Sequence, residues 1–157
     1  MKVKVLAIGT RMPKWVSDGY QEYARRMPSR LTLELQELAL ARRGKGEPTA
    51  RAIESEGKAA IESLKSGDYL VVLDVKGKPI STEQLAQSLS KWEMEGLSRV
   101  VLLIGGPDGV SNECLDRADK VWSLSALTMP HPLVRVLLVE QLYRACMINA
   151  GHPYHRD

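Results

Sequence analysis

Phenylalanine is absent from the 157-residue chain, and cysteine occurs only as Cys114 and Cys146. The hydrophobic core must therefore be built from leucine, valine, isoleucine, alanine and three tryptophans. The two cysteines form no C-x-x-C pair and have no histidine at ligand spacing, which argues against a zinc site or a disulfide framework. No apolar run approaches the roughly 20 residues of a membrane-spanning helix. The start, MKVKVLAIGT, is typical of a strand rather than a signal peptide. We therefore expect a cytoplasmic protein without metal or membrane contact.

The composition is that of a globular protein, with 44% hydrophobic and 26% charged residues. A chain of this length is expected to form one domain, residues 1–157, with a core of its own. Its net charge of +3 permits a nucleic-acid partner but does not require one.

Strand-like and helix-like segments alternate along the chain, which predicts an α/β fold with a mostly parallel sheet flanked by helices. Residues 31–38 alternate between apolar and polar, as in a strand near the sheet edge. Ser81 and Gln84 form a capping-box pattern at a helix start. The expected strands are 2–10, 31–38, 68–75, the run SRVVLLIGG and 120–125. Helices are expected from Pro13 to about Met27, after the mobile loop ARRGKGEP, and from Ser81, Ser111 and Pro132.

The last helix, from Pro132 to about Asn149, carries more apolar residues than a single buried stripe needs. Either it is wholly buried, or one side packs on the sheet and the other on a partner subunit. A domain of this size has little room for a central helix, so we favour the second arrangement.

The segment GGPDG (105–109) follows a buried strand, at the edge where parallel α/β sheets bind ligands. It matches neither G-x-G-x-x-G nor the P-loop pattern, and no lysine follows it. Pro107 also removes a backbone donor that a phosphate cradle would use. Taken alone, the segment is typical of a tight turn.

A second segment, SLSALTMPHP (123–132), is small, apolar and bounded by proline, with no charge before His131. Surface loops are usually more polar, so its backbone is expected to line a pocket. Such a pocket suits an adenine ring and a sulfonium methyl, two parts of S-adenosylmethionine. A buried connection between strand and helix is the alternative.

Histidine occurs only at positions 131, 152 and 155. The terminal GHPYHRD could act in acid–base chemistry, bind RNA or metal, or have no function. Basic residues lie on the ARRGKGEP loop (Arg42, Arg43, Lys45), on the last helix (Arg135, Arg144) and in the tail (Arg156). The loop and tail together resemble two arms around a polyanion.

Three motifs carry a family resemblance: LLIGGPDG, WSLSALTMPHPLVRVLLVEQLYRA and the terminal PYHR. With the start AIGTRMPKWV, they make the chain resemble the RlmH family over essentially its whole length. These are SPOUT-class methyltransferases that act on pseudouridine in 23S ribosomal RNA. Met129, Asp157 and the variable loop 42–46 depart slightly from the family pattern.

The resemblance implies an α/β knot, in which the C-terminal segment forms a deep trefoil, and a homodimer built through the C-terminal helix. It also implies methyl transfer to N3 of pseudouridine 1915 in helix 69 of 23S rRNA, on the assembled ribosome and without metal. The implied cofactor is S-adenosylmethionine, held by Leu73, Gly105, Leu124, Ser125, Ala126, Leu127, Thr128 and Met129.

Within that resemblance we expect His155 to handle the N3 proton or orient the base, and Tyr154 to stack on the base. Arg156 and Arg135 would hold phosphate or developing negative charge. His131 is either structural or catalytic. The tail of one subunit would complete the site of the other. Two alternatives stay open: a ribosome-binding factor without chemistry, and a methyltransferase for another RNA base.

Overall fold

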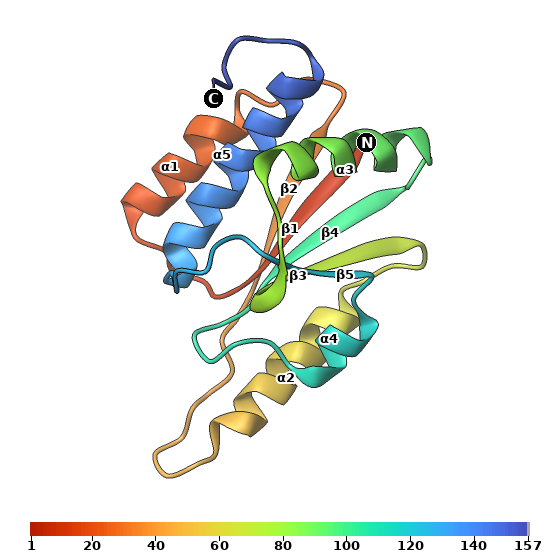
Figure 1. Ribbon diagram of the computed structural model, residues 1–157. Coiled ribbons are helices and arrows are strands. Elements are labelled where there is room, and N and C mark those ends of the chain that lie inside the picture. The colour runs from red at the N-terminus through yellow and green to blue at the C-terminus, as the bar shows by residue number, and fades with distance from the viewer. Residues whose placement is uncertain (157) are drawn as a thin grey trace.

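The computed structural model describes residues 1–156; Asp157, the last residue of the expected domain, lies outside them. Within that range, parallel strands form a five-stranded sheet in the order β2-β1-β4-β3-β5. Helices cover both faces of the sheet (Figure 1). The strands are β1 (Lys2–Ile8), β2 (Thr32–Leu38), β3 (Asp68–Pro79), β4 (Arg99–Ile104) and β5 (Lys120–Ser123). The helices are α1 (Lys14–Ala24), α2 (Thr49–Glu62), α3 (Thr82–Met94), α4 (Asn112–Arg117) and α5 (His131–Asn149).

These elements confirm the predicted parallel α/β fold. The alternating strand β2 lies at the sheet edge, as its pattern predicts. The capping box at the start of α3 is also confirmed, because Ser81 accepts from the Gln84 N–H while the Gln84 side chain accepts from the Ser81 N–H. Pro132 lies in the first turn of α5, where a missing N–H costs nothing.

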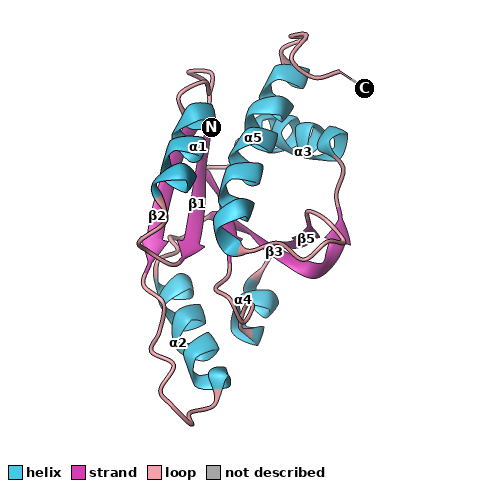
Figure 2. Ribbon diagram, turned by 90° about the vertical axis from the view of Figure 1, so that its left-hand side faces the viewer, coloured by secondary structure: helices cyan, strands magenta, loops and turns pink. Residues whose placement is uncertain are grey.

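Successive residues of the central strands point into two separate hydrophobic layers. In β3, Val71 and Leu73 face the layer beneath α3 and α5, whereas Leu70 and Val72 face α2 and α4. The side view separates the two groups of helices (Figure 2). In place of phenylalanine, Trp92 of α3 stacks on Trp122 of β5, with ring centroids 5.6 Å apart.

Helix α5 lies between α1 and α3 (Figure 1), which accounts for much of its apolar circumference. Gly19 of α1 packs so closely that a Cβ there would lie 3.2 Å from Cγ1 of Val136. On the other side, Asn149 donates to the Ala86 carbonyl of α3 at 2.9 Å. Leu133 stays 40% exposed. Because these contacts all lie within one chain, the partner subunit on α5 remains a prediction.

Strand β3 differs most from its predicted bounds, because it continues past Val75 to Pro79. Its register against β5 shifts between Leu73 and Lys78, so that both residues pair with Trp122. Gly77 makes this second approach feasible, since a Cβ there would lie 2.7 Å from the Trp122 carbonyl carbon. The sequence KGKP, which is typical of a turn, thus forms the end of a bent strand.

Three other boundaries were predicted too long. β1 ends at Ile8 because Gly9, at φ +141°, leaves the strand conformation. α1 ends at Ala24 rather than Met27, since the N–H groups of Arg26 and Met27 close 3₁₀-type turns. β5 ends at Ser123, whose hydroxyl donates to the Ser125 carbonyl and turns the chain. Across residues 1–156, no helix is long and apolar enough to cross a bilayer.

Candidate functional site

The cofactor-binding residues predicted from the sequence lie at the carboxyl edge of the sheet, where its parallel strands end. Leu73 of β3 pairs with Ile104 of β4 on one side and with Trp122 of β5 on the other. Gly105 directly follows Ile104, and Leu124 comes two residues after Trp122. The strand register therefore places Leu73, the loop 105–109 and the start of the loop 124–129 next to one another.

The loop 105–109 is a tight turn, as its sequence predicts. Gly106 and Gly109 form an isolated bridge, and the Gly109 N–H donates to the Gly106 carbonyl at 3.2 Å. Ser111 then caps α4 by accepting from the Cys114 N–H. The turn is therefore fixed at one end by β4 and at the other by a capped helix.

The loop 124–129 presents neutral side chains to solvent. Leu127 is 76% exposed, although large apolar side chains are usually covered. The Leu127 N–H donates to the Ser125 hydroxyl, which shapes the loop from within. With no lysine or arginine between Ser123 and Pro130, the loop offers apolar contact without positive charge.

His131 connects the turn 105–109 to helix α5. Its Nδ1 lies 2.8 Å from the Gly105 carbonyl oxygen, and its Nε2 lies 2.7 Å from Nε of Arg135. A guanidinium only donates, so Nε2 accepts and the imidazole proton sits on Nδ1, where it is donated to Gly105. Burial, together with the Arg135 charge, lowers the pKa of His131 below its ordinary value. His131 therefore stays neutral beside the turn.

Arg135 is 2% exposed, and each of its three guanidinium nitrogens donates to an acceptor within the protein. Besides contacting His131, it donates from Nη1 to Glu37 of β2 at 2.5 Å and from Nη2 to the Gly9 carbonyl at 2.7 Å. These contacts join the first turn of α5 to the ends of β1 and β2. In this arrangement Arg135 positions the strand ends rather than presenting a free charge to RNA.

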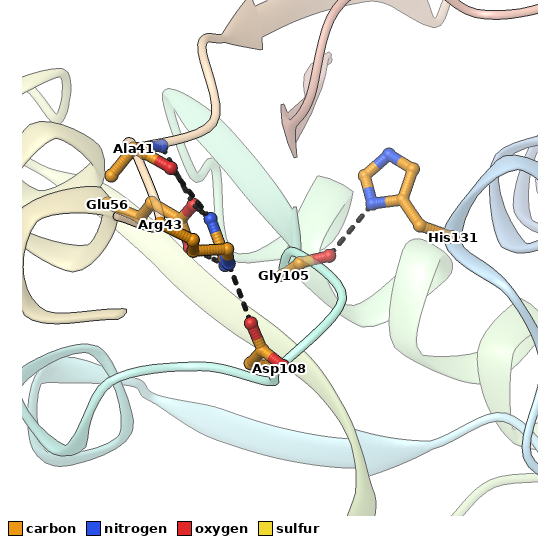
Figure 3. Close-up of polar contacts among 6 residues, drawn as sticks. All are labelled: Ala41, Arg43, Glu56, Gly105, Asp108 and His131. Carbon is orange, nitrogen blue, oxygen red and sulfur yellow. Dashed lines mark hydrogen bonds and ion pairs between the residues drawn. The ribbon is translucent and has the colours of Figure 1, made fainter. Parts of the chain in front are cut away.

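The opposite side of the turn is held by Arg43 (Figure 3). Its Nε donates to Asp108 at 2.7 Å, and its Nη1 and Nη2 donate to Glu56 of α2 at 2.8 and 3.2 Å. Glu56 is only 4% exposed. The sequence predicts a mobile loop around Arg43, but these bonds fix the arginine between two elements.

The C-terminal tail forms a second polar cluster, on the side of α5 near the start of α3. The Tyr154 hydroxyl donates to Glu140 at 3.1 Å, and Arg144 lies over the Tyr154 ring, 4.8 Å from its centroid. His155 lies 3.4 Å from Arg144 through Nδ1 and 3.3 Å from Glu83 through Nε2. Arg156 is exposed and donates to the Pro153 carbonyl.

Within one chain, the residues expected to be catalytic thus form two groups. Arg135 is joined to the turn 105–109 through His131, whereas Tyr154 and His155 lie against the middle of α5 and the start of α3. Exposed Arg156 contacts the tail itself, at Pro153. About five residues of helix, roughly 7.5 Å of axial rise, separate Arg135 from the Glu140 contact of Tyr154.

Sequence reasoning missed three acidic residues of this region: Glu37, Glu56 and Asp108. A signal for Glu56 was present, because it lies four residues from both Ala52 and Ala60, on the buried face of α2. A charged residue at such a position needs a partner, which is Arg43. Glu37 also gave a signal, because it follows polar Gln36 at a position of β2 where the alternation of Leu31, Leu33 and Leu35 calls for an apolar residue.

The residues at this edge fit a cofactor with an adenine ring and a sulfonium cation. The turn 105–109 supplies small residues, the loop 124–129 supplies the exposed Leu127, and His131 carries no charge that would repel a sulfonium. Among residues 1–156, no group of three or more His, Cys, Asp or Glu side chains is arranged to hold a metal ion.

Comparison with known proteins defines the class to which this fold and edge belong. The model of a family described as "Predicted SPOUT methyltransferase" matches residues 1–155. Three relatives match over 99% of this chain and 100% of their own length. They come from Saccharophagus degradans (57% identity), Marinomonas sp. (49%) and Pseudomonas syringae pv. syringae (50%). Each of the three is named ribosomal RNA large subunit methyltransferase H.

The matched family covers nearly the whole chain, including the turn 105–109, the loop 124–129 and the tail. The chain belongs to the SPOUT methyltransferases, in the family whose members carry the name ribosomal RNA large subunit methyltransferase H. The resemblance seen in the sequence motifs is thereby confirmed.

Proposed function

We propose that the protein transfers a methyl group from S-adenosylmethionine to N3 of pseudouridine 1915, in helix 69 of 23S rRNA. The substrate is the assembled ribosome, in the cytoplasm. The observation that supports this most strongly is full-length similarity, at 57% identity, to a protein named for methylation of large-subunit ribosomal RNA. The convergence of Leu73, Gly105 and the loop 124–129 at one sheet edge supports the cofactor assignment.

In this proposal, S-adenosylmethionine is held by Leu73, Gly105 and residues 124–129, and when bound it supplies an electrophilic methyl group. The chain's own part is to exclude water, align the reactants and remove the N3 proton of the base. Neutral His131 keeps positive charge away from the sulfonium while fixing the Gly105 carbonyl. Leu127, exposed in the free protein, offers an apolar surface for a flat ring.

The tail supplies the groups that meet RNA. His155 handles the proton or orients the base, Tyr154 stacks on it, and Arg156 holds phosphate. Arg135, whose three guanidinium nitrogens all donate inside the protein, acts on the site through His131 and Gly9. Exposed Arg42 and Lys45 extend the positive surface next to the turn 105–109.

The proposal includes the family's deep trefoil knot and a homodimer built on α5. The separation of the tail from the turn 105–109 within one chain supports the dimer. A tail from the partner subunit, reaching across the interface, would bring Tyr154 and His155 to the cofactor edge. Exposed Leu133 on α5 supports an interface near that edge.

Methyl transfer to ribosomes from cells lacking the protein is the decisive measurement. We expect radiolabel from S-adenosylmethionine to enter 23S rRNA of whole ribosomes, with little transfer to free rRNA or tRNA. Transfer to a different base would support the alternative target. A ribosome-binding factor without chemistry would show no binding of the cofactor at millimolar concentration in calorimetry.

A further inference from the structure

The guanidinium of Arg43 donates hydrogen bonds to three separate parts of the structure. Nη1 donates to the Ala41 carbonyl at 2.9 Å and to Glu56 at 2.8 Å, while Nε donates to Asp108 at 2.7 Å. Ala41 belongs to the connection between β2 and α2, Glu56 to α2, and Asp108 to the turn that follows β4. The side chain is 24% exposed, so solvent only partly screens these contacts.

Glu56 fixes the position of the Arg43 guanidinium. Its carboxylate is nearly inaccessible and also accepts from the Ala41 N–H at 3.0 Å. A buried carboxylate requires a positive partner, and Arg43 provides two parallel donors to it. The position of the guanidinium is therefore set by α2, and its Nε is directed at Asp108 (Figure 3).

The turn packs directly against the same segment. A Cβ on Gly106 would lie 3.1 Å from Glu56 Oε1 and 3.1 Å from Cδ2 of Leu40. The turn is thus held on one side by Arg43, Glu56 and Leu40, and on the other by the bond from His131 to the Gly105 carbonyl.

We propose that Arg43 is a positioning residue for cofactor binding: by bridging Glu56 and Asp108 it holds the turn 105–109 in the shape that receives S-adenosylmethionine. This rests on the cofactor assignment under Proposed function. The proposal gives the three basic residues of the loop different roles. Arg42 and Lys45, both exposed, face solvent and RNA, whereas Arg43 acts inward on the cofactor site.

The test measures binding of S-adenosylmethionine by calorimetry for the wild type and for Arg43→Ala, Arg43→Lys, Asp108→Ala and the double variant Arg43→Ala/Asp108→Ala. Arg42→Ala is the matched control, because it removes the same charge one residue away. We expect Arg43→Ala to raise the Kd about tenfold. Asp108→Ala, which breaks only the partly exposed ion pair, should raise it about three- to fivefold.

Two further expectations distinguish the loss of the Arg43 bridge between Glu56 and Asp108 from a general loss of stability. The double variant should bind no more weakly than Arg43→Ala, because both substitutions remove the same bridge. Arg43→Lys should be intermediate, since an ammonium lacks the planar fork that reaches both carboxylates. Asp108→Ala leaves the Arg43–Glu56 pair intact, so it remains informative if Arg43→Ala fails to fold.

Hydrogen exchange of amides 105–110 in the ligand-free protein provides a readout independent of the cofactor. We expect faster exchange in Asp108→Ala than in Arg42→Ala. If Asp108→Ala and Arg43→Ala are both folded and both bind the cofactor with the wild-type Kd, the inference is overturned. Wild-type protein that binds no cofactor at all overturns the proposed function instead.

Discussion

Arg135 donates from Nε to Nε2 of His131 at 2.7 Å, and this bond fixes the tautomer of a histidine that touches the candidate cofactor site. Since Nε2 is an acceptor, Nδ1 carries the proton and donates it to the Gly105 carbonyl. One turn of α5 thereby connects the ends of β1, β2 and β4, which Arg135 and His131 contact through Gly9, Glu37 and Gly105.

Acidification should weaken the fold through His131. Its pKa is lowered, chiefly by burial, so at mildly acidic pH the folded protein binds fewer protons there than the unfolded chain does. The His131 contribution to the free energy of unfolding is therefore present above the ordinary pKa of 6.5 and declines as the pH falls below it. Glu37 opposes this shift and Arg135 adds to it.

Urea unfolding at about pH 7.5 and about pH 5.5 checks this expectation. His131→Gln keeps an acceptor for Arg135 but does not titrate, so it should lose less stability between the two pH values than the wild type. His152→Gln, on the exposed tail, is the matched control. Equal pH dependence in wild type and His131→Gln would contradict the assignment.

Removing the Arg135 guanidinium should destabilise the protein strongly. Arg135→Met leaves the Gly9 carbonyl and His131 Nε2 without a donor, and costs about 2–4 kcal/mol. Glu37→Gln should cost less, about 0–1 kcal/mol, because the Glu37 side chain is 37% exposed and solvent replaces part of its interaction. Urea denaturation of the wild type, Arg135→Met and Glu37→Gln gives both values. Similar losses of stability from the two substitutions would contradict a central role for the buried Arg135 contacts.

The sequence was sufficient to predict most of the fold, because its local signals are strong. Alternation placed β2 at the edge, the Ser81–Gln84 pattern marked the start of α3, and Pro132 marked that of α5. The bend in β3 could not be predicted, since it depends on the approach of Gly77 to Trp122 of another strand. No local pattern encodes such a long-range contact.

The candidate site was predictable in part for the same reason. Motifs located Gly105 and the loop 124–129, and the strand register then places them beside Leu73. The polar network around them was not foreseen, because Arg43 and Arg135 look like surface charges until the chain is folded. Glu37 is 98 residues from Arg135, and although the position of Glu56 on α2 calls for a partner, no local pattern selects Arg43, 13 residues away.

Gly77→Ala should disturb the cofactor edge from a distance. An added Cβ would lie 2.7 Å from the Trp122 carbonyl carbon, and backbone atoms cannot rotate away as a side chain can. We expect a loss of about 1–3 kcal/mol in unfolding free energy and weaker binding of S-adenosylmethionine, because Trp122 leads into the loop 124–129. Gly44→Ala is the control, since its Cβ would meet only the flexible Glu47 side chain. Equal stability of the two variants would argue against close packing at Gly77.

Ending the chain after Gly151 should separate catalysis from cofactor binding. The deletion removes Tyr154 and His155, so methyl transfer should fall at least about a hundredfold, as expected when proton handling and base stacking are lost together. The turn 105–109 and the loop 124–129 keep their contacts, so the Kd for S-adenosylmethionine should stay within about threefold of wild type. Calorimetry and transfer to ribosomes measure the two effects.

Mixing the truncated subunit with a full-length Gly105→Trp subunit should restore transfer if the tail acts across the dimer, because one site then has both a tail and an intact turn. Unchanged turnover of the truncated protein would refute the role given to His155.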